Sequence, residues 1–285
     1  MKSVVITGAS TGIGRAIAEH LAAQKWIVFA GVRKEADGAP LVEAHDNIRP
    51  ILLDVTKPDQ VAAAVQSVTE TLGERTLDGL VNNAGIAIMG PLALQPMEEI
   101  RAHFDVNVFG AVATTQAFAP LLGMDRDRIG SPGRIINITS NGGKVASPIL
   151  GAYTATKHAM ESITDTLRRE LMLYDIDAIA VGPGAVKTPI WDKADEKAAN
   201  APYQDTEWAD PVRKFSEISM SSGQDGLDAH VIARVVEKAL TVSKPKARYA
   251  PVQNKLTNFT ILTRLPKRWV DRIFASRLGL NRQTA

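Results

Sequence analysis

The chain has 285 residues, a length that fits one large α/β domain or two small ones. Hydrophobic residues make up 45% of it and charged residues 22%, which is ordinary for a globular protein that buries a sizeable core. The formal net charge of +2 is too small to indicate a nucleic-acid partner. Cysteine is absent, which excludes disulfides, thiol nucleophiles and cysteine-based metal sites, and no metal site is expected.

The N-terminal residues do not resemble a signal peptide, because Met1 and Lys2 lead directly into a short apolar run and then a glycine cluster. No apolar stretch reaches the length that is needed to span a bilayer. We therefore expect a soluble, cytoplasmic protein.

Short apolar or β-branched runs recur along the chain and predict seven strands. They lie at residues 4–6, 27–30, 51–53, 79–81, 134–138, 178–181 and 248–252. Segments with apolar residues at helical spacing lie between them, at 15–25, 58–72, 97–122, 153–174 and 229–242. Strands that alternate with helices pair in parallel through right-handed crossovers. The pattern predicts one α/β domain over residues 1–285, a doubly wound parallel seven-stranded sheet with helices on both faces.

Two stretches break the alternation of strands and helices. Residues 189–226 are polar and longer than an ordinary connection, which predicts either a functional lid or a poorly ordered segment. Residues 253–285 follow the last strand and predict a C-terminal helical extension. Within it, Pro266 suits the first turn of a helix and Gly279 can cap its end.

A glycine-rich turn follows the first predicted strand and opens the first helix. It reads Gly8-Ala9-Ser10-Thr11-Gly12-Ile13-Gly14, with the spacing G-x-x-x-G-x-G. Without Cβ atoms, backbone N–H groups can approach a pyrophosphate, and the helix N-terminus adds partial positive charge. The alternative is a tight turn without a ligand. Its place after the first strand of a parallel sheet favours nucleotide binding.

Ser140, Tyr153 and Lys157 form a second pattern. Ser140 follows the fifth predicted strand, and Tyr153 and Lys157 lie one turn apart on one face of the next helix. A phenol ordinarily titrates near pH ~10. A cation ~4 Å away at an effective dielectric of ~20 contributes roughly 4 kcal/mol, which lowers the pKa by about three. Each residue alone is typical of packing, a turn or a solvated surface, but their joint spacing indicates an acid/base site.

These motifs resemble those of the short-chain dehydrogenase/reductase family, in the branch that includes 17β-hydroxysteroid and retinol dehydrogenases. The resemblance covers residues 3 to about 190. It rests on residues 7–14, 82–85, Asn107, Ser140, Tyr153, Lys157, Pro183, Gly184 and Thr188. The resemblance implies a Rossmann-type fold and an enzyme that transfers a hydride between NAD(P)(H) and a secondary alcohol or carbonyl.

The resemblance also implies a role for each site residue. Tyr153 is expected to be the acid/base, and Lys157 to lower its pKa and bond the nicotinamide ribose. Ser140 is expected to orient the substrate carbonyl, and Asn107 to hold a water in a proton relay that reaches Lys157. Further residues are expected to bind the cofactor: Gly8, Ser10, Thr11, Gly12, Ile13, Gly14, Arg33, Asp54, Val55, Asn83, Ala84, Gly85, Pro183, Gly184, Val186 and Thr188.

The choice between NAD and NADP depends on the end of the second strand. An acidic residue there favours NAD, and an arginine favours the 2′-phosphate of NADP. The usual acid position holds Gly31, and Arg33 follows closely, which resembles the NADP-preferring pattern. Thr11 is an argument against NADP, since it occupies the position where many NADP-preferring relatives have a basic residue. We expect NADP(H), with NAD(H) as the alternative.

The residues expected around the reacting centre indicate the substrate class. They are Ile88, Met89, Val145, Pro148, Ile149, Leu150, Ile190 and Trp191. Apolar walls suit a small lipophilic carbonyl or alcohol substrate. A 3-oxoacyl or 3-hydroxy acid reaction is the alternative, and a cationic anchor in the pocket would favour it. A non-catalytic nucleotide sensor is a third hypothesis, but such a protein has no need of the complete set Asn107, Ser140, Tyr153 and Lys157.

The C-terminal helix predicted at 266–280 is amphipathic. Trp269, Val270, Ile273, Phe274 and Leu278 form its apolar stripe, and basic residues lie opposite. Such a helix can lie on an anionic membrane, but docking beside the substrate cleft or across a subunit interface is favoured. The family resemblance further implies a homodimer or homotetramer built on the helices that begin at Met97 and Tyr153.

Overall fold

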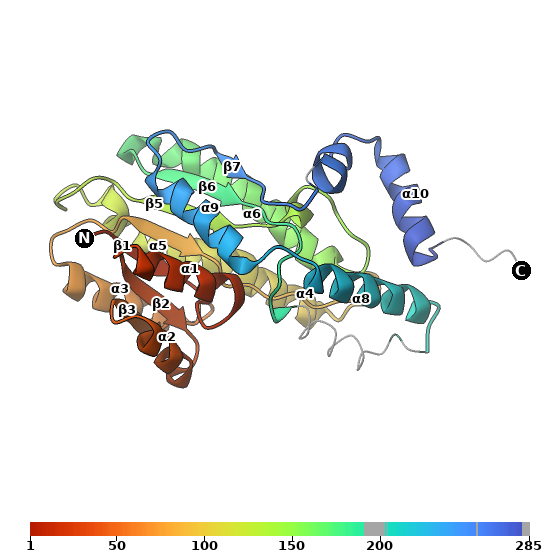
Figure 1. Ribbon diagram of the computed structural model, residues 1–285, viewed down its shortest axis with the longest axis horizontal. Helices are drawn as coiled ribbons and strands as arrows, with labels where there is room; N and C mark the ends of the chain where they lie inside the picture. The colour runs from red at the N-terminus through yellow and green to blue at the C-terminus, as the bar shows by residue number, and fades with distance from the viewer. Residues whose placement is uncertain (191–202, 204, 255, 281–285) are drawn as a thin grey trace, which may run out of the picture.

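The computed structural model describes residues 1–190, 203, 205–254 and 256–280. Within them, a seven-stranded parallel sheet has the order β3-β2-β1-β4-β5-β6-β7 (Figure 1). The strands are β1 (Ser3–Ile6), β2 (Ile27–Val32), β3 (Ile48–Leu52), β4 (Gly79–Asn82), β5 (Arg134–Ile138), β6 (Asp177–Val181) and β7 (Arg248–Tyr249). The chain reverses its direction of winding between β1 and β4, as in doubly wound sheets. The predicted fold is confirmed.

Helices cover both faces of this sheet (Figure 1). They are α1 (Gly12–Ala23), α2 (Ala39–Ala44), α3 (Pro58–Leu72), α4 (Met97–Phe104), α5 (Ala111–Phe118), α6 (Gly151–Glu170), α8 (Ala209–Gln224), α9 (Ala229–Thr241) and α10 (Lys267–Leu278). α1 and α9 pack against each other on one face, whereas α3, α5 and α6 cover the other. The short helix α2 has no counterpart among the predicted elements.

Alternate residues of β1 face the two helical layers. Val4 and Ile6 belong to the core on the α1 and α9 side, and Val5 packs on the opposite side with Phe29 and Phe118. Successive side chains of a strand point to opposite faces, so a strand between two helical layers is apolar throughout. This explains why the strands are visible in the sequence as continuous apolar runs.

The helix predicted over residues 97–122 is interrupted. A π-helical turn, η2 (Asp105–Gly110), separates α4 from α5, and a second, η3 (Pro120–Met124), follows α5. Each π-helical turn spaces its hydrogen bonds one residue further apart than an α-helix does, and such turns are frequent at functional sites. Asn107 lies in η2 and is buried. The last strand is also shorter than predicted, because β7 ends at Tyr249.

The lid and the C-terminal extension are largely helical where they are described. α8 lies within the predicted lid, whereas residues 191–202 and 204, which include Trp191, lie outside the described part of the chain. Pro266 directly precedes α10, and Gly279 caps it with a φ of 71°, in the left-handed region. The C-terminal helix thus begins one residue after and ends two residues before the predicted range of 266–280, with Gly279 in the predicted capping role.

α10 docks on α8 through only part of its predicted apolar stripe. Phe274 and Leu278 join an apolar cluster with Tyr203 and Phe215. Trp269 is 58% exposed, so the prediction that it docks with the rest of the stripe is wrong. The reason is helical geometry, since nine residues are about two and a half turns, which places Trp269 opposite Leu278.

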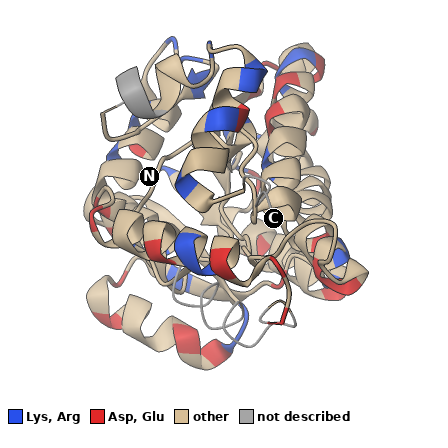
Figure 2. Ribbon diagram, turned by 90° about the vertical axis from the view of Figure 1, so that its right-hand side faces the viewer, with Lys and Arg blue, Asp and Glu red and all other residues tan. Residues whose placement is uncertain are grey.

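The surface carries charges of both signs. Basic and acidic residues lie intermixed on the helices of the side that Figure 2 shows. No helix within the described ranges combines the length and the apolar character that a membrane span requires. The expected dimer or tetramer stays a prediction.

Candidate active site

A cavity of about 1050 Å³ opens where the parallel strands end. Its walls include residues that lie one or two positions after β1, β2, β3, β4, β5 and β6. Small-molecule pockets usually have volumes of roughly 300–1,000 Å³, so this cavity has room for a dinucleotide together with a second molecule. Nucleotides bind at this edge of open α/β sheets, where the winding reverses.

Most of the predicted site residues meet in this cavity. Those that line it are Gly8, Ser10, Thr11, Gly12, Ile13, Arg33, Asp54, Val55, Asn83, Ala84, Gly85, Ser140, Tyr153, Lys157, Pro183, Gly184, Val186 and Thr188. Gly14 and Asn107 do not line it. Both lie directly behind its wall, as the following contacts show.

The turn after β1 packs tightly against the end of β4. Gly8 has a φ of 65°, and a Cβ atom on it would lie 2.9 Å from Cα of Ala84. A Cβ atom on Gly14 would overlap the carbonyl oxygen of Gly8 and Nδ2 of Asn83. Only glycine fits both positions, and Gly8 and residues 10–13 of the turn line the cavity. This cradle fits a pyrophosphate at the N-terminus of α1.

Asn83 holds this turn in place. Its Nδ2 donates hydrogen bonds to the carbonyl oxygens of Thr7 (3.0 Å) and Gly8 (2.9 Å). The hydroxyl of Thr7 in turn accepts from the backbone N–H groups of Asn83 and Ala84, at 3.0 Å each. The side chain of Asn83 thus joins β1 to β4 at the point where the cavity begins.

Arg33 and Asp54 lie at the far end of the cavity from Tyr153. Burial acts to raise the pKa of Asp54, but hydrogen bonds from Thr56 and the positive charge of Arg33 together lower it. Arg33 is exposed and lines the cavity next to Val32. Gly31 is buried and does not line the cavity, whereas the uncharged Val32 does.

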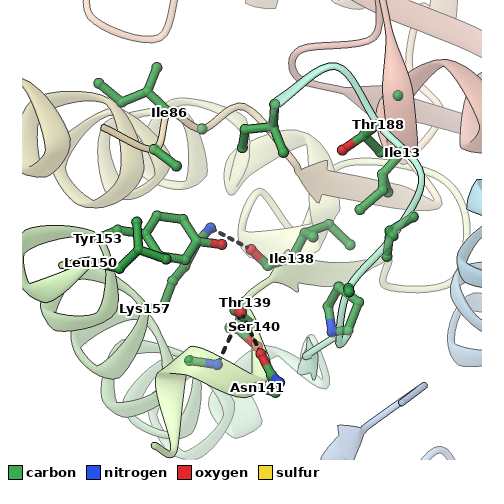
Figure 3. A pocket seen from close by; sticks show the side chains of 18 of the residues that line it. Ile13, Ile86, Ile138, Thr139, Ser140, Asn141, Leu150, Tyr153, Lys157 and Thr188 are labelled. Carbon is green, nitrogen blue, oxygen red and sulfur yellow. Dashed lines mark hydrogen bonds between the residues drawn. The ribbon is translucent and has the colours of Figure 1, made fainter. Parts of the chain in front are cut away.

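Tyr153 and Lys157 project from the first two turns of α6 toward the end of β5 (Figure 3). The Lys157 Nζ atom lies 5.6 Å from the centre of the Tyr153 ring and donates a 3.0 Å hydrogen bond to the carbonyl oxygen of Ile138. The Ser140 hydroxyl accepts from the N–H of Gly142 at 3.0 Å and donates to Oδ1 of Asn141 at 3.2 Å. A phenol, an ammonium and a hydroxyl therefore meet at one point of the cavity wall.

Burial dominates the electrostatics of this point. It raises the pKa of Tyr153 above its ordinary value, and the hydrogen-bonded Ser140 hydroxyl acts in the opposite direction. Burial also lowers the pKa of Lys157 to about 8. The pKa of Tyr153 is therefore raised, whereas the sequence predicted that it would be lowered. The reason is that removing a phenolate from water costs more free energy than its interactions with neighbouring groups contribute.

Asn107 supports the wall from behind. Its Oδ1 accepts from the N–H of Ile86 at 2.8 Å, and its Nδ2 donates to the carbonyl oxygen of Ile86 at 3.0 Å and to Oγ1 of Thr156 at 3.1 Å. A Cβ atom on Gly85 would lie 3.3 Å from Oδ1 of Asn107 and 3.7 Å from Nζ of Lys157. The proton relay expected for Asn107 stays a prediction.

The predicted apolar wall is confirmed only in part. Ile88, Val145, Leu150 and Ile190 line the cavity. Met89, Pro148 and Ile149 do not, and Met89 and Ile149 pack in the cluster beneath α8 and α10. The segment predicted as a lid and the C-terminal extension contribute lining residues that the sequence did not reveal: Ile218, Ser219, Phe259, Leu262 and Arg277. No local motif marks them, because only tertiary packing brings their segments to the cavity.

Comparison with known proteins finds matches over most of the chain. The family model described as short chain dehydrogenase matches residues 2–199. The chain is 37% identical over 275 residues to an NADPH-dependent 3-dehydrocapnine reductase of Ornithobacterium rhinotracheale, with 96% of each chain covered. It is 38% identical over 208 residues to estradiol 17-beta-dehydrogenase 2 of Mus musculus, which covers 69% of this chain and 52% of that protein. A short chain dehydrogenase/reductase from Burkholderia phymatum in complex with NAD has a TM-score of 0.79 at 25% identity, with 95% of both chains covered.

The fold and the cavity define a dinucleotide-binding α/β enzyme. The chain belongs to the short-chain dehydrogenase/reductase family, as its motifs predicted. It is therefore an oxidoreductase that transfers a hydride between a nicotinamide cofactor and a carbonyl or alcohol group.

We predict that the buried Lys157 ammonium makes the free energy of unfolding depend on pH. Its pKa falls from 10.5 to about 8 on folding, so between these values the unfolded chain binds more protons and the folded state gains stability as the pH rises. In Lys157→Met this gain is lost. Between pH ~8 and pH ~10.5 the free energy of unfolding of wild type should therefore rise by about 3 kcal/mol more than that of the variant, measured by urea unfolding without cofactor. Lys144→Met is the matched control, since the Lys144 side chain is 41% exposed. Parallel pH profiles for wild type and Lys157→Met would contradict the prediction.

Proposed function

We propose that this enzyme interconverts a lipophilic ketone or aldehyde and the corresponding alcohol with NADP(H), using Tyr153 as the acid/base. The observation that carries the proposal is the meeting of Tyr153, Lys157 and Ser140 at the wall of one cavity. That cavity is lined by a glycine cradle at one end and by apolar side chains at the other.

Each side chain of the constellation has a chemical task in this proposal. The Tyr153 hydroxyl donates a proton to the carbonyl oxygen during reduction and accepts it during oxidation. The Ser140 hydroxyl holds the same oxygen. The buried Lys157 ammonium stabilises the phenolate of Tyr153, and Asn107 keeps the loop at Ile86 in place. When bound, the nicotinamide supplies the hydride.

The preference for NADP(H) is supported by Arg33. Its guanidinium is exposed beside the adenosine end of the cavity, next to the uncharged Val32. An arginine there can form charge-assisted hydrogen bonds with a 2′-phosphate. The relative from Ornithobacterium rhinotracheale is named as NADPH-dependent, and the structure from Burkholderia phymatum holds NAD. NAD(H) therefore remains the alternative.

The lipophilic substrate class is supported by the walls beyond Tyr153. The side chains there are Ile88, Val145, Leu150, Ile190, Ile218, Phe259, Leu262 and Phe274. Burial of apolar surface against them favours a bulky apolar substrate by about 25 cal/mol per Å². Polar residues line the cavity as well, among them Ser147, Ser219, Ser222, Asp225 and Gln253, and such groups can orient a substrate that apolar walls bind.

The test is a panel of lipophilic ketones, aldehydes and alcohols with both cofactors, followed by the absorbance of the reduced nicotinamide. Wild type is expected to turn over bulky apolar members best. Tyr153→Phe should lower kcat by about 100-fold or more, because it removes the proton donor while keeping the ring. The Kd for NADPH, measured by fluorescence, should stay close to that of wild type. A variant that keeps more than about a tenth of the wild-type kcat would contradict the role of Tyr153.

We also predict that Arg33→Asp shifts the cofactor preference toward NADH. The carboxylate repels a 2′-phosphate and accepts hydrogen bonds from a free ribose diol. The ratio of kcat/KM for NADPH over NADH should fall roughly 10-fold or more, the usual effect of losing a hydrogen bond to a charged group. Arg15→Asp, which alters the basic residue of a surface pair with Glu19, is the control for charge alone. An unchanged ratio in Arg33→Asp would mean that the phosphate is bound elsewhere or that the enzyme uses NAD(H).

A second candidate function, a reaction on a 3-oxo or 3-hydroxy acid, is supported by Arg277. This exposed arginine of the last turn of α10 lines the cavity together with Phe274. It is a cationic group of the kind that an acidic substrate requires. If the candidate is correct, Arg277→Gln should raise KM for carboxylate-bearing ketones roughly 10-fold while KM for uncharged ketones stays the same. Equal effects on both substrate classes would leave the lipophilic proposal in place.

A further inference from the structure

A buried ion pair lies behind Ser140 and takes no part in the proposed acid/base step. Glu161 lies one helical turn after Lys157 on the same face of α6, and its side chain is 7% exposed. The Arg248 guanidinium of β7 donates through Nε to both carboxylate oxygens of Glu161, at 3.0 and 2.9 Å. Lys144 approaches the same carboxylate at 3.1 Å from the exposed side.

This pair is attached to the end of β5 at successive residues. The Thr139 hydroxyl donates to Oε1 of Glu161 at 2.7 Å. The Nη2 atom of Arg248 donates to the carbonyl oxygen of Ser140 at 3.3 Å. Lys157 already holds the carbonyl oxygen of Ile138. Three consecutive residues, Ile138 to Ser140, are therefore each fixed by a charged side chain.

The pair is also connected to the C-terminal extension. The Arg248 guanidinium lies over the ring of Phe259, 5.0 Å from its centre, and Phe259 lines the cavity. On its other side Arg248 passes so close to Gly182 that a Cβ atom there would overlap the guanidinium. The guanidinium is thus confined between β6, α6 and the extension.

We propose that Glu161 and Arg248 are positioning residues that fix the end of β5, and with it the Ser140 hydroxyl, and that Phe259 couples this clamp to the C-terminal extension. This inference rests on the proposed role of Ser140. Rigid placement matters because an error of about 1 Å in a reacting group can cost a factor of about 100 in rate. A planar guanidinium can bind a carboxylate and a carbonyl group at once, whereas a lysine ammonium cannot reproduce that geometry.

The variants separate positioning from simple charge pairing. Arg248→Met removes the guanidinium but leaves Glu161 with Lys144 and Thr139, so the carboxylate keeps partners. Arg248→Lys keeps a cation for Glu161 but loses the planar link to Ser140. Lys144→Met, which removes the other cation of the same carboxylate, is the matched control. Phe259→Leu tests the coupling to the extension.

Both Arg248 variants are expected to lower kcat roughly 10- to 100-fold, while KM and the Kd for NADPH change less than about twofold. Phe259→Leu should produce a smaller loss of kcat, and Lys144→Met none. Alcohol oxidation requires deprotonated Tyr153, so the ascending, acidic limb of its pH profile should move to higher pH in the Arg248 variants, because Ser140 no longer lowers the pKa of Tyr153. A kcat in Arg248→Lys equal to that of wild type would overturn the proposal, since charge alone would then suffice.

Amide hydrogen exchange gives a readout that does not depend on turnover. If the clamp positions this segment, residues 139–145 should exchange faster in Arg248→Met and Arg248→Lys than in wild type and Lys144→Met. Unchanged exchange would overturn the proposal, whereas a wild-type enzyme inactive on the whole panel would contradict only the proposed function. If Arg248→Met does not fold, Arg248→Lys alone decides between these outcomes.

Discussion

The close packing of the turn after β1 against the end of β4 is the contact on which the rest of the site depends. Thr7, Gly8 and Asn83 are joined there by hydrogen bonds of 2.9–3.0 Å, and Gly14 lies against both Gly8 and Asn83. This packing holds two strands that are neighbours in the sheet but 75 residues apart along the chain. It fixes the start of α1 and opens the cavity between the two strands. Parallel pairing then brings the ends of β5 and β6 to the same edge, so that residues from distant parts of the chain share one wall.

The reacting end of the cavity combines burial with few but specific polar contacts. Burial alone makes both a phenolate at Tyr153 and an ammonium at Lys157 costly, which is why their pKa values move in opposite directions. A positive charge brought into the same space acts on both groups, favouring the phenolate and disfavouring the ammonium. Burial therefore favours the neutral form of both groups, and the charge of a group that enters this space changes the balance for each.

The sequence predicted the sheet and the nucleotide half of the site because both depend on local patterns. Apolar runs identify strands that are covered on both faces, and the glycine turn, Asn83 and the Tyr153–Lys157 spacing are short motifs. The π-helical turn at Asn107 was missed, since its apolar spacing differs little from that of an α-helix. Phe259 and Arg277 reach the cavity, and Arg248 reaches the end of β5, through the packing of separate segments. The exposure of Trp269 depends on how α10 is rotated against α8. None of these features has a local signal.

The two halves of the cavity are attached to the molecule in different ways. The nucleotide half consists of strand ends and turns that belong to the central sheet, whereas much of the substrate half comes from α8, the segment around Phe259 and α10, which packs on α8 outside the sheet. Segments with few contacts to a common core can open locally at a lower free energy than the core itself. They can also accept mutations without loss of the fold. If the cavity binds cofactor and substrate as proposed, substitutions in α8 and α10 can therefore reshape the substrate half while the central sheet and the turn after β1 stay unchanged.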